Sequence, residues 1–588
     1  MKRRKFIKGA AILGVGGLFL PKLSLTSSSA SAPETGELLY NGIQLPGTWP
    51  PRNMDPASYN PMPVPYLENR PEIVPIHVGR QLFVDDFLIE STDMKRISHK
   101  ARKLNFNPVL KSETKLEQGL WGVPGASAKD GGVWWDPQDK LFKMWYEAGW
   151  LNSMAYAVSK DGIHWERPDL DIEPGTNRLV PDIVSDSSTV WLDRFTENQA
   201  ERFKMFLRSP NTVPGMNEHF NYGFSMVSPD GIHWGKPVKT GPCGDRSTFF
   251  YNPFRKKWVY SIRNAGNINQ APNGRCRYYH EHDDFLKGAR WEKGEPVYWT
   301  GADNLDIPDP YIGQKPQLYN LSAVGYESLM LGLHQIHLGP TNEVCVEKGV
   351  PKITELMVSF SRDGFHWHRP EREAFIPAER KQGYWDRGYV QSVGGICAVV
   401  GDQLWFYYIG FSGNSKFVNP EYAKNGMHSN GSTGIAVLRR DGFMSMQAGK
   451  NEGELTTRPV SFDGEYLFVN VDCPAGQLKV EILDRDYAVI APFDASSCLP
   501  VSANSTIKQI SWKGAKNLAS LKGKPVRFRF HLVNGELYSF WVSPDKTGAS
   551  HGYNASGGPG FNGGVDLEGT TAYKQAANFP NLLNPCYK

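Results

Sequence analysis

Three stretches of the chain decide the fold: SKDGIHWERP from Ser159, SPDGIHWGKP from Ser228 and SRDGFHWHRP from Ser361. Each reads Ser-x-Asp-Gly, then an apolar residue, His and Trp. This phrase suits a turn, because Asp accepts backbone hydrogen bonds, Gly adopts positive φ and Trp buries a large ring. The repeated histidines are therefore expected at outer turns rather than in a metal triad. A repeated phrase predicts a repeated unit of architecture.

The residues before each phrase predict three β-strands, and a fourth strand is expected after the Trp. Two further units lack the phrase but keep the strand pattern, DRSTFFYNPFRKKWVYSIRNAG and GYVQSVGGICAVVGDQLWFYYIGFSG. Together these segments make five four-stranded units at a spacing of roughly seventy residues, which predicts a five-bladed β-propeller. The stretch GRQLFVDDFLIE near residue 80 is expected to complete the ring. Its Asp85 and Asp86 are interpreted as structural.

After Gly449 apolar and polar residues alternate between Gly-containing turns, which predicts a β-sandwich. The fold class is therefore all-β, a five-bladed propeller followed by a sandwich. The expected divisions are an export signal (1–32), a Pro-rich segment (33–75), the propeller (76–450), the sandwich (451–548) and a Gly/Asn-rich tail expected to pack as coil (549–588).

The first residues combine a basic head containing Arg3-Arg4, a short apolar stretch and a small-residue region, which is typical of an export signal similar to the twin-arginine type. An ordinary secretory signal is the alternative. The apolar stretch is too short for a stable membrane span. Export predicts a periplasmic or extracellular protein.

Charge excludes one class of partner. The chain has a net charge of +4, and residues 1–32 contain six Lys/Arg and no acid, so the exported form is near neutral. No basic run indicates nucleic-acid binding. The seven cysteines include no CxxC pair, which argues against a metal knuckle. Cys473 and Cys498 are expected to form the disulfide if one exists.

The Ser-x-Asp-Gly-x-x-Trp blade endings resemble those of the five-bladed propeller glycosidase superfamily, which includes arabinanases, invertases and neoagarobiose hydrolases. The resemblance covers roughly residues 76–548. It implies an active site at one mouth of the propeller, where inner strands begin and second strands end. Matching the blades places these charged residues at that mouth: Asp130, Glu147, Asp186, Asp245, Arg208, Arg246, Arg263, Lys315 and His334.

The resemblance also implies catalytic roles. An Asp acts as nucleophile or base, a second Asp orients, and a Glu is the acid, because one carboxyl group donates a proton while the other attacks or activates water. Asp130 matches the first role, and Asp186 or Asp245 the second. Where a third-blade Glu is expected the sequence has Asp245-Arg246, so Glu147 is the nearest substitute acid.

The cations at the mouth favour a sugar that carries a carboxylate or a sulfate, since Arg binds either group through two hydrogen bonds. Substrate binding is therefore assigned to Arg208, Arg246, Arg263, Lys315 and Asp186, with Trp121 as a stacking platform. If the sugar is a uronic acid, His334 or a Tyr is the base that removes its C5 proton.

These residues leave three functions open. The first interpretation is an exported glycoside hydrolase acting on the terminal sugar of an anionic algal or plant polysaccharide. The second is a lyase or dehydratase that eliminates water or a sugar from a terminal uronate. The third is a propeller that binds glycans without catalysis. No cofactor is required, and the propeller channel is compatible with a structural calcium ion.

Overall fold

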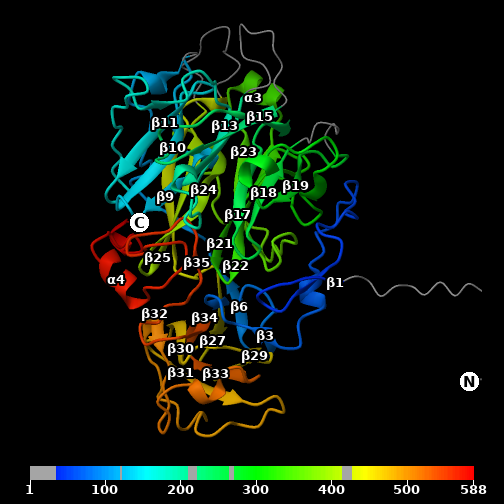
Figure 1. Cartoon of the computed structure of the whole chain (residues 1–588), viewed down its shortest axis with the longest axis vertical. Helices are drawn as coiled ribbons and strands as arrows, with labels where there is room; N and C mark the ends of the chain where they lie inside the picture. Colours follow the sequence, from blue (N-terminus) through cyan, green and yellow to red (C-terminus); the bar gives the residue numbers. More distant parts are fainter. Residues whose placement is uncertain (1–34, 120–121, 210–221, 264–270, 414–426, 588) are drawn as a thin grey trace, which may run out of the picture.

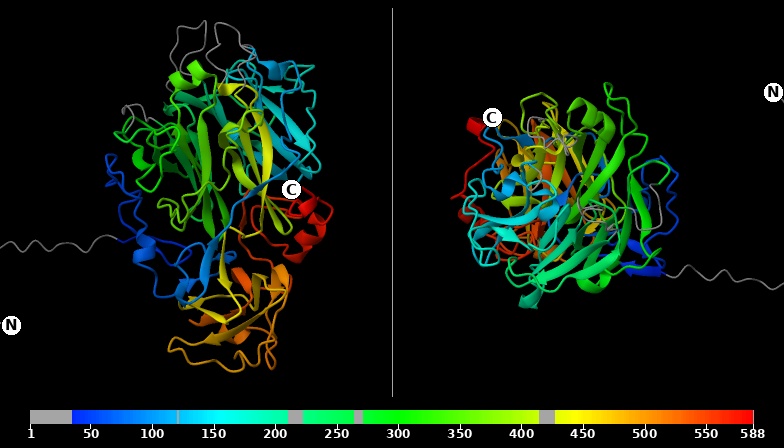
Figure 2. Two further views of the ribbon diagram at one scale, coloured as in Figure 1. Left: turned by 180° about the vertical axis from the view of Figure 1, so that it is seen from behind. Right: turned by 90° about the horizontal axis from the view of Figure 1, so that it is seen from above.

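The computed structural model describes residues 35–119, 122–209, 222–263, 271–413 and 427–587. Its upper part is a ring of five antiparallel sheets, and its lower part is a pair of sheets stacked face to face (Figure 1). The predicted architecture of a five-bladed propeller with a β-sandwich is confirmed by this sheet topology. Figure 2 (right) views the molecule from above, with the propeller in front of the sandwich.

The blades follow one another along the chain. Blade 1 contains β8 (Ala126–Ser127), β9 (Val133–Asp136), β10 (Leu141–Ala148), β11 (Ser153–Ser159) and β12 (Arg178–Leu179). Blade 2 contains β13 (Ser187–Leu192), β14 (Phe203–Arg208), β15 (Tyr222–Ser228) and β16 (Val238–Pro242). Blade 3 contains β17 (Thr248–Asn252), β18 (Lys257–Ile262), β19 (Cys276–His282) and β20 (Val297–Gly301).

Blades 4 and 5 borrow strands from the two ends of the chain. Blade 4 contains β21 (Gln317–Glu327), β22 (Leu329–Gly339) and β23 (Ile353–Ser361), and β35 (Tyr553–Asn554) of the C-terminal tail pairs with β21. Blade 5 contains β24 (Gly388–Val400), β25 (Gln403–Phe411) and β26 (Ser432–Arg439), and its outer strand is β7 (Arg102–Lys103). Strand β7 therefore closes the ring, because it joins the start of the propeller to its last blade.

The three repeated phrases occupy equivalent turns, directly after the third strands β11, β15 and β23. In each turn the Ser hydroxyl accepts the Gly N–H at 2.8–2.9 Å. The Asp accepts further backbone N–H groups and also contacts the His Nδ1 at 2.7 Å. The phrase is thus a self-contained turn, as its residue types predict.

The sandwich consists of two sheets. One contains β32 (Asn504–Gln509), β30 (Tyr466–Asp472), β34 (Gly535–Ser543), β27 (Met444–Ala448), β6 (Lys95–Ser98) and β4 (Gln81–Leu82). The other contains β31 (Gln477–Leu483), β33 (Arg527–Val533), β28 (Gly453–Thr457) and β5 (Ile89–Thr92). Two small sheets pair β1 (Thr35–Leu38) with β2 (Gln44–Pro46), and β3 (Val74–Pro75) with β29 (Val460–Ser461).

Helices are short. They are α1 (Pro65–Glu68), α2 (Phe285–Gly288), α3 (Asn342–Lys348) and α4 (Thr570–Ala576), with 3₁₀ turns η1 (Leu116–Gln118), η2 (Lys129–Gly131), η3 (Gln199–Glu201), η6 (Ala519–Leu521) and η7 (Pro585–Tyr587). Among the described residues, no helix has the length and apolarity needed to cross a membrane.

The prediction that the stretch near residue 80 completes the ring is wrong. Strand β4 pairs with β34 and strand β5 pairs with β28, so both belong to the sandwich. Phe83 and Phe87 explain this placement, because both rings are fully buried in the sandwich core. Asp85 is structural, as expected, and pairs with the Arg362 guanidinium at 2.8 Å. The strands of the sandwich thus begin before the propeller and continue after it.

Two other expectations change. Cys473 and Cys498 are both free thiols: the Cys473 thiol donates to the Val501 carbonyl, whereas the Cys498 sulfur accepts the Val480 N–H. The C-terminal tail is more ordered than coil, since it contributes β35 and α4. Leu582 of the tail is buried in the core shared by blades 1 and 5.

Candidate active site

The candidate site lies at the end of the propeller that faces away from the sandwich. The opposite ends of the blades meet the sandwich and tail, where Glu327 pairs with Arg80 and with Arg440. Because β21 ends at Glu327, its first residue Gln317 lies at the free end. Inner strands therefore begin, and second strands end, at this free mouth, which is where the resemblance places the site.

Asp130 lies in η2, directly before the innermost strand of blade 1, and its side chain is 1% exposed. One carboxylate oxygen lies 2.9 Å from Arg246 Nη1. The other accepts hydrogen bonds from Asn320 at 3.1 Å and from Ser322 at 3.2 Å. Burial raises the pKa of Asp130, although Arg246 and Arg277 oppose this shift. Asp130 thus joins blades 1, 3 and 4 at the base of the mouth.

Arg246 connects this carboxylate to a second buried guanidinium group. Its Nη2 donates to Gln335 Oε1 at 3.3 Å, and its backbone carbonyl accepts Arg277 Nη1 at 2.7 Å. Arg277 is fully buried on β19, and no carboxylate among the described residues forms an ion pair with it. Burial and the positive charges of Arg263 and Arg246 lower the pKa of Arg277 to about 9, although Asp245 and Asp130 oppose this shift.

Glu147, near the end of β10, is held by a neighbouring lysine. Lys129 Nζ forms an ion pair with the Glu147 carboxylate and donates to the Asp186 carbonyl at 2.8 Å. The Leu151 N–H donates to Glu147 Oε1 at 3.1 Å. Burial raises the pKa of Glu147, while Lys129 opposes this effect and the Asp186 charge adds to it.

Asp186 and Asp245 are the two carboxyl groups of the cluster that reach solvent. Both are partly exposed, and the Asp245 side chain is 34% exposed. Burial raises the pKa of Asp186, and the Asp245 charge raises it further. Burial alone would also raise the pKa of Asp245. The ion pair with Arg263 and the charges of Lys352 and Arg208 outweigh burial and lower the pKa of Asp245 to about 2.

Opposite shifts within one pair of interacting carboxyl groups have a chemical meaning. Asp186 keeps its proton to a higher pH than an ordinary aspartate, whereas Asp245 is ionised over almost the whole pH range. Such a pair supplies a proton donor and a proton acceptor at the same pH, which is the requirement for general acid–base catalysis. Neighbouring charges and burial that separate two pKa values in this way mark a functional site more often than a structural one.

A tyrosine pair with a lysine borders the cluster on the side of blades 4 and 5. Tyr319 and Tyr389 share a hydrogen bond of 2.6 Å between their hydroxyl oxygens. Lys352 Nζ lies 5.5 Å from the Tyr319 ring centre and 5.1 Å from that of Tyr389, and Arg263 lies 5.8 Å from the former. Burial favours neutral Tyr319, but Lys352 and Arg263 outweigh it and lower its pKa.

Blade matching brings together most of the predicted residues. Asp130, Glu147, Asp186, Asp245, Arg208, Arg246 and Arg263 lie in one charge cluster, as these contacts and mutual pKa effects show. Arg208, the last residue of β14, is fully buried and its charge lowers the pKa of both Asp186 and Asp245. Trp121 lies outside the described residues, so its predicted role stays a prediction.

His334 is not part of the cluster. Its Nδ1 contacts the Ser359 hydroxyl at 2.9 Å, and its fully buried ring meets Trp367 edge-on. The reason is strand alternation, because a shift of one residue along β22 turns a side chain to the other face of the sheet. The neighbouring Gln335 is the residue that faces Arg246.

Lys315 is also placed elsewhere. It is exposed, donates to Asn273 at 2.9 Å and lies 3.6 Å from the Tyr59 ring centre. It therefore anchors the N-terminal segment. Conversely, sequence matching missed Arg277 and Lys352, because both belong to third strands or the residues before them, and only inner and second strands were compared.

The cluster does not fit the calcium ion that the sequence analysis allowed in the channel. Calcium prefers six to eight oxygen ligands, several of them carboxylates. The Asp130 oxygens are instead taken by Arg246, Asn320 and Ser322, and Arg277 adds another positive charge beside them. Within the described residues no group of three or more His, Cys, Asp or Glu side chains is arranged to hold a metal ion.

No protein-family model matches the chain, and no curated protein matches it. Similar solved structures include an N-acetylgalactosamine deacetylase from F. plautii in complex with blood group B trisaccharide, 16% identical, covering 58% of this chain and 95% of that chain at a TM-score of 0.40. A thermostable family-43 glycoside hydrolase is 10% identical and covers 54% of this chain and 92% of that chain, at a TM-score of 0.35.

A GH32 β-fructofuranosidase from Bombyx mori is 11% identical and covers 77% of this chain and 96% of that chain, at a TM-score of 0.34. Two of these three proteins are named as glycosidases and one as a deacetylase. Similarity at this level carries no argument about substrate or reaction. Those must come from the residues of the mouth.

Proposed function

We propose that this protein is a carbohydrate-active enzyme, a glycoside hydrolase that acts on an anionic oligosaccharide at the propeller mouth. The observation that carries the proposal is the pair Asp186 and Asp245, two partly exposed carboxyl groups whose pKa values are moved in opposite directions. Glycoside hydrolysis requires two carboxyl groups in different protonation states, one on each side of the scissile bond.

In the proposed reaction Asp186 is the acid and Asp245 the base. Asp186 donates its proton to the glycosidic oxygen as the bond between that oxygen and the sugar C1 breaks. Asp245 accepts a proton from a water molecule whose oxygen forms the new bond to C1. One water molecule is consumed, and its hydrogen and hydroxyl end on the two products. Both carboxyl groups exchange a proton with solvent before the next turnover.

This assignment differs from the one that the resemblance implies for Asp130. Its carboxylate is 1% exposed and is already engaged by Arg246, Asn320 and Ser322. We therefore propose that Asp130 is a positioning residue, which fixes Arg246 beneath the reacting pair. Glu147 has the same relation to Lys129, whose ammonium group also binds the Asp186 backbone.

The charge balance supports an anionic substrate. Among the described residues other than Arg208, the cluster contains four carboxyl groups (Asp130, Glu147, Asp186, Asp245) and five cationic side chains (Lys129, Arg246, Arg263, Arg277, Lys352). The pKa values of three of the carboxyl groups, Asp130, Glu147 and Asp186, are raised. A carboxylate or sulfate on the bound sugar would balance this excess. Action on a terminal sugar of an algal or plant polysaccharide, and export to the periplasm or cell exterior, remain part of the proposal.

A second candidate reaction, elimination from a terminal uronate, is favoured by Tyr319. Its hydroxyl shares a hydrogen bond with that of Tyr389, and the charges of Lys352 and Arg263 beside its ring favour a phenolate. In that reaction Tyr319 would take the C5 proton, the bond from C4 to its oxygen would break, and an acid would protonate the leaving oxygen. A double bond between C4 and C5 would result.

The test is product analysis with purified protein on acidic and neutral oligosaccharides. Hydrolysis gives a new reducing end, elimination gives a conjugated double bond, and a binding protein leaves the substrate unchanged. Asp186→Asn and Asp245→Asn should each lower turnover by about a hundredfold to ten-thousandfold. Asp182→Asn is the matched control, since Asp182 lies four residues from Asp186 and is exposed. Normal turnover of both site variants would refute the assignment.

A further inference from the structure

The third repeated turn lies in a different environment from the other two. The contact between Asp and His has the same length, 2.7 Å, in all three turns. The His164 side chain is 87% exposed and that of His233 is 53% exposed, whereas that of His366 is 9% exposed. The local geometry is therefore the same in all three turns, but the histidine is exposed in the first two turns and covered in the third.

The N-terminal segment covers the third turn and is anchored at both ends of the covered region. Near one end, Asn41 Nδ2 donates to the carbonyl of Arg362 at 2.8 Å. Near the other, the carbonyls of Ala57 and Ser58 accept hydrogen bonds from Asn273 at 2.9 and 2.8 Å. These anchors hold the segment across the outer side of blades 3 and 4, where Figure 1 shows it in blue.

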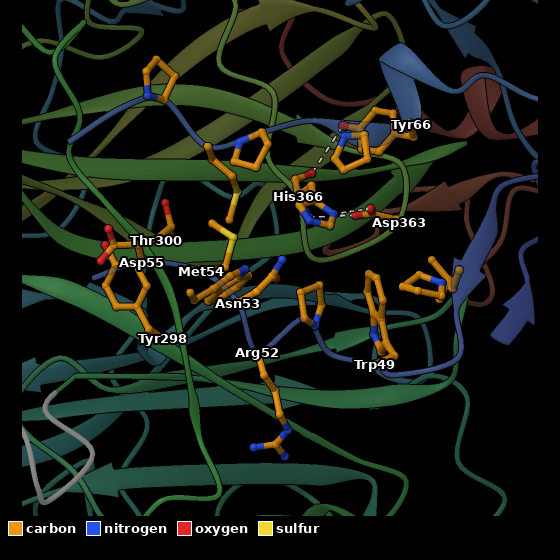
Figure 3. A pocket seen from close by; sticks show the side chains of 18 of the residues that line it. Trp49, Arg52, Asn53, Met54, Asp55, Tyr66, Tyr298, Thr300, Asp363 and His366 are labelled. Carbon is orange, nitrogen blue, oxygen red and sulfur yellow. Dashed lines mark hydrogen bonds and ion pairs between the residues drawn. The ribbon is translucent and has the colours of Figure 1, made fainter. Parts of the chain in front are cut away.

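A cavity of about 1210 Å³, partly open to solvent, lies beneath this segment. Its walls are residues 42–71 of the segment, β20 with the residues that follow it, and the turn containing Asp363 and His366 (Figure 3). This volume exceeds the roughly 300–1000 Å³ typical of small-molecule sites. The cavity is distinct from the mouth, because β23 separates them: Lys352 precedes the first residue of this strand, and Asp363 follows its last.

The cavity lining combines aromatic rings with hydrogen-bonding groups. Trp49 and Tyr298 supply rings, and Asn53 and Thr300 supply an amide and a hydroxyl, as Figure 3 shows. Asp363 occupies Nδ1 of His366, so Nε2 is the ring nitrogen left for a ligand. Sugar rings have apolar C–H faces and hydroxyl rims, and a wall of this composition complements both surfaces.

The charged residues that line this cavity differ from those at the mouth. Its acidic residues are Asp55, Asp303 and Asp363, and its only full cation among the described lining residues is Arg52. The Arg52 side chain extends away from the other labelled side chains in Figure 3. Asp303 is paired with Arg372 at 2.8 Å and Asp363 contacts His366 at 2.7 Å, so the lining offers no surplus positive charge that would attract an anionic sugar.

We propose that this cavity binds a neutral sugar unit, as a second carbohydrate site on the outer side of the propeller. The identity of the ligand as carbohydrate rests on the proposed function. His366 Nε2 hydrogen-bonds a sugar hydroxyl, and Tyr298 packs against the ring. The enzyme would then hold a neutral part of a polysaccharide at this site while the mouth acts on a charged terminal sugar.

The experiment measures binding of neutral gluco-, manno-, galacto- and xylo-oligosaccharides to the full chain by ligand-observed NMR and calorimetry. His366→Ala should weaken binding about tenfold, the effect of losing one hydrogen bond at the upper end of the usual range. His164→Ala removes the same Asp–His contact from an exposed turn and should change nothing. Asp245→Asn, which disables the mouth, should leave this binding intact, and Tyr298→Ala should weaken it independently of the turn.

Absence of neutral-sugar binding to the wild-type protein would overturn the inference. So would binding that Asp245→Asn abolishes while His366→Ala and Tyr298→Ala retain it, since the sugar would then occupy the mouth. The two proposals fail separately. Hydrolysis without cavity binding refutes this inference alone, whereas cavity binding without any turnover refutes the proposed catalysis alone.

Discussion

Arg246 Nη1 lies 2.9 Å from Asp130 Oδ2, and the two side chains are 4% and 1% exposed. The pair joins the start of blade 1 to the start of blade 3 across the propeller axis. Two opposite charges so deeply buried stabilise each other, but each would be costly without its partner. The pair is therefore a structural support at the base of the mouth. Measuring its contribution to stability distinguishes a positioning role of Asp130 from a catalytic one.

Arg246→Met should lower the free energy of unfolding by about 3–5 kcal/mol, because it leaves the Asp130 carboxylate buried without its counter-charge. Denaturant unfolding of the full chain measures this value. Adding Asp130→Asn to this variant should recover much of the loss, because it removes the unpaired buried charge, and a double-mutant cycle quantifies the recovery. If Asp130→Asn removed turnover without changing stability, Asp130 would be the catalytic base that the resemblance implies.

The pH dependence of turnover should be bell-shaped with an acidic maximum. Asp245 must be ionised, which holds above its pKa of about 2. Asp186 must be protonated, which holds below its raised pKa. Turnover therefore rises as the pH passes Asp245 and falls as it passes Asp186. A rate that keeps increasing through neutral and alkaline pH would contradict Asp186 as the acid.

The two aspartates should affect stability in opposite directions. A raised folded-state pKa means that ionised Asp186 destabilises the fold: its contribution is most favourable below the unfolded pKa of about 3.9 and is lost as pH rises through the folded value. Asp186→Asn should therefore increase the free energy of unfolding at neutral pH and match the wild type in acid. Thermal unfolding at several pH values measures the difference, and a less stable variant at neutral pH would contradict the sign.

Asp245→Asn should have the reverse effect. The lowered pKa means that ionised Asp245 stabilises the fold above about pH 3.9, and that this contribution is lost as pH falls through about 2. The variant should be less stable than the wild type at neutral pH and equal to it in strong acid. Solvent screening limits the size of the effect because the Asp245 side chain is 34% exposed. If Asp245→Asn were more stable than the wild type at neutral pH, the ion pair between Arg263 and Asp245 would not stabilise the fold.

Arg208→Gln should weaken binding of an anionic oligosaccharide by about tenfold, because it removes a buried positive charge from beneath the mouth. A neutral analogue of the same length should bind almost unchanged. Arg246→Gln serves as the comparison. Because Arg246 pairs with Asp130, this variant should be less stable and should bind charged and neutral ligands equally weakly. Equal losses of both ligands with Arg208→Gln would mean that the arginine holds blade 2 in place.

The repeated phrases made the architecture predictable, because each carries its own turn. Ser159 Oγ accepts the Gly162 N–H and donates to Asp161 Oδ1, which also accepts backbone N–H groups from within the next three residues. The turn therefore depends on local sequence alone. Blade matching also found Asp186 and Asp245 at the mouth. These positions follow from strand direction and require no knowledge of side-chain partners.

What the sequence could not supply was pairing between distant segments. Strand β7 closes the ring through Arg102 opposite Val437, a contact with no local signal, whereas the more apolar stretch near Phe83 belongs to the sandwich. His334 was misplaced by a single residue of register. Lys352 reaches the mouth only because Tyr319 and Tyr389 from neighbouring blades lie against it.

The most direct test of the central claim is mass analysis of products formed from acidic oligosaccharides in water enriched in heavy oxygen. If Asp245 activates water while Asp186 protonates the leaving sugar, one heavy oxygen enters the new reducing end. The wild-type protein and Asp182→Asn should give this labelled product, and Asp245→Asn should give almost none. An unlabelled product with a new double bond would contradict hydrolysis and assign the chemistry to elimination.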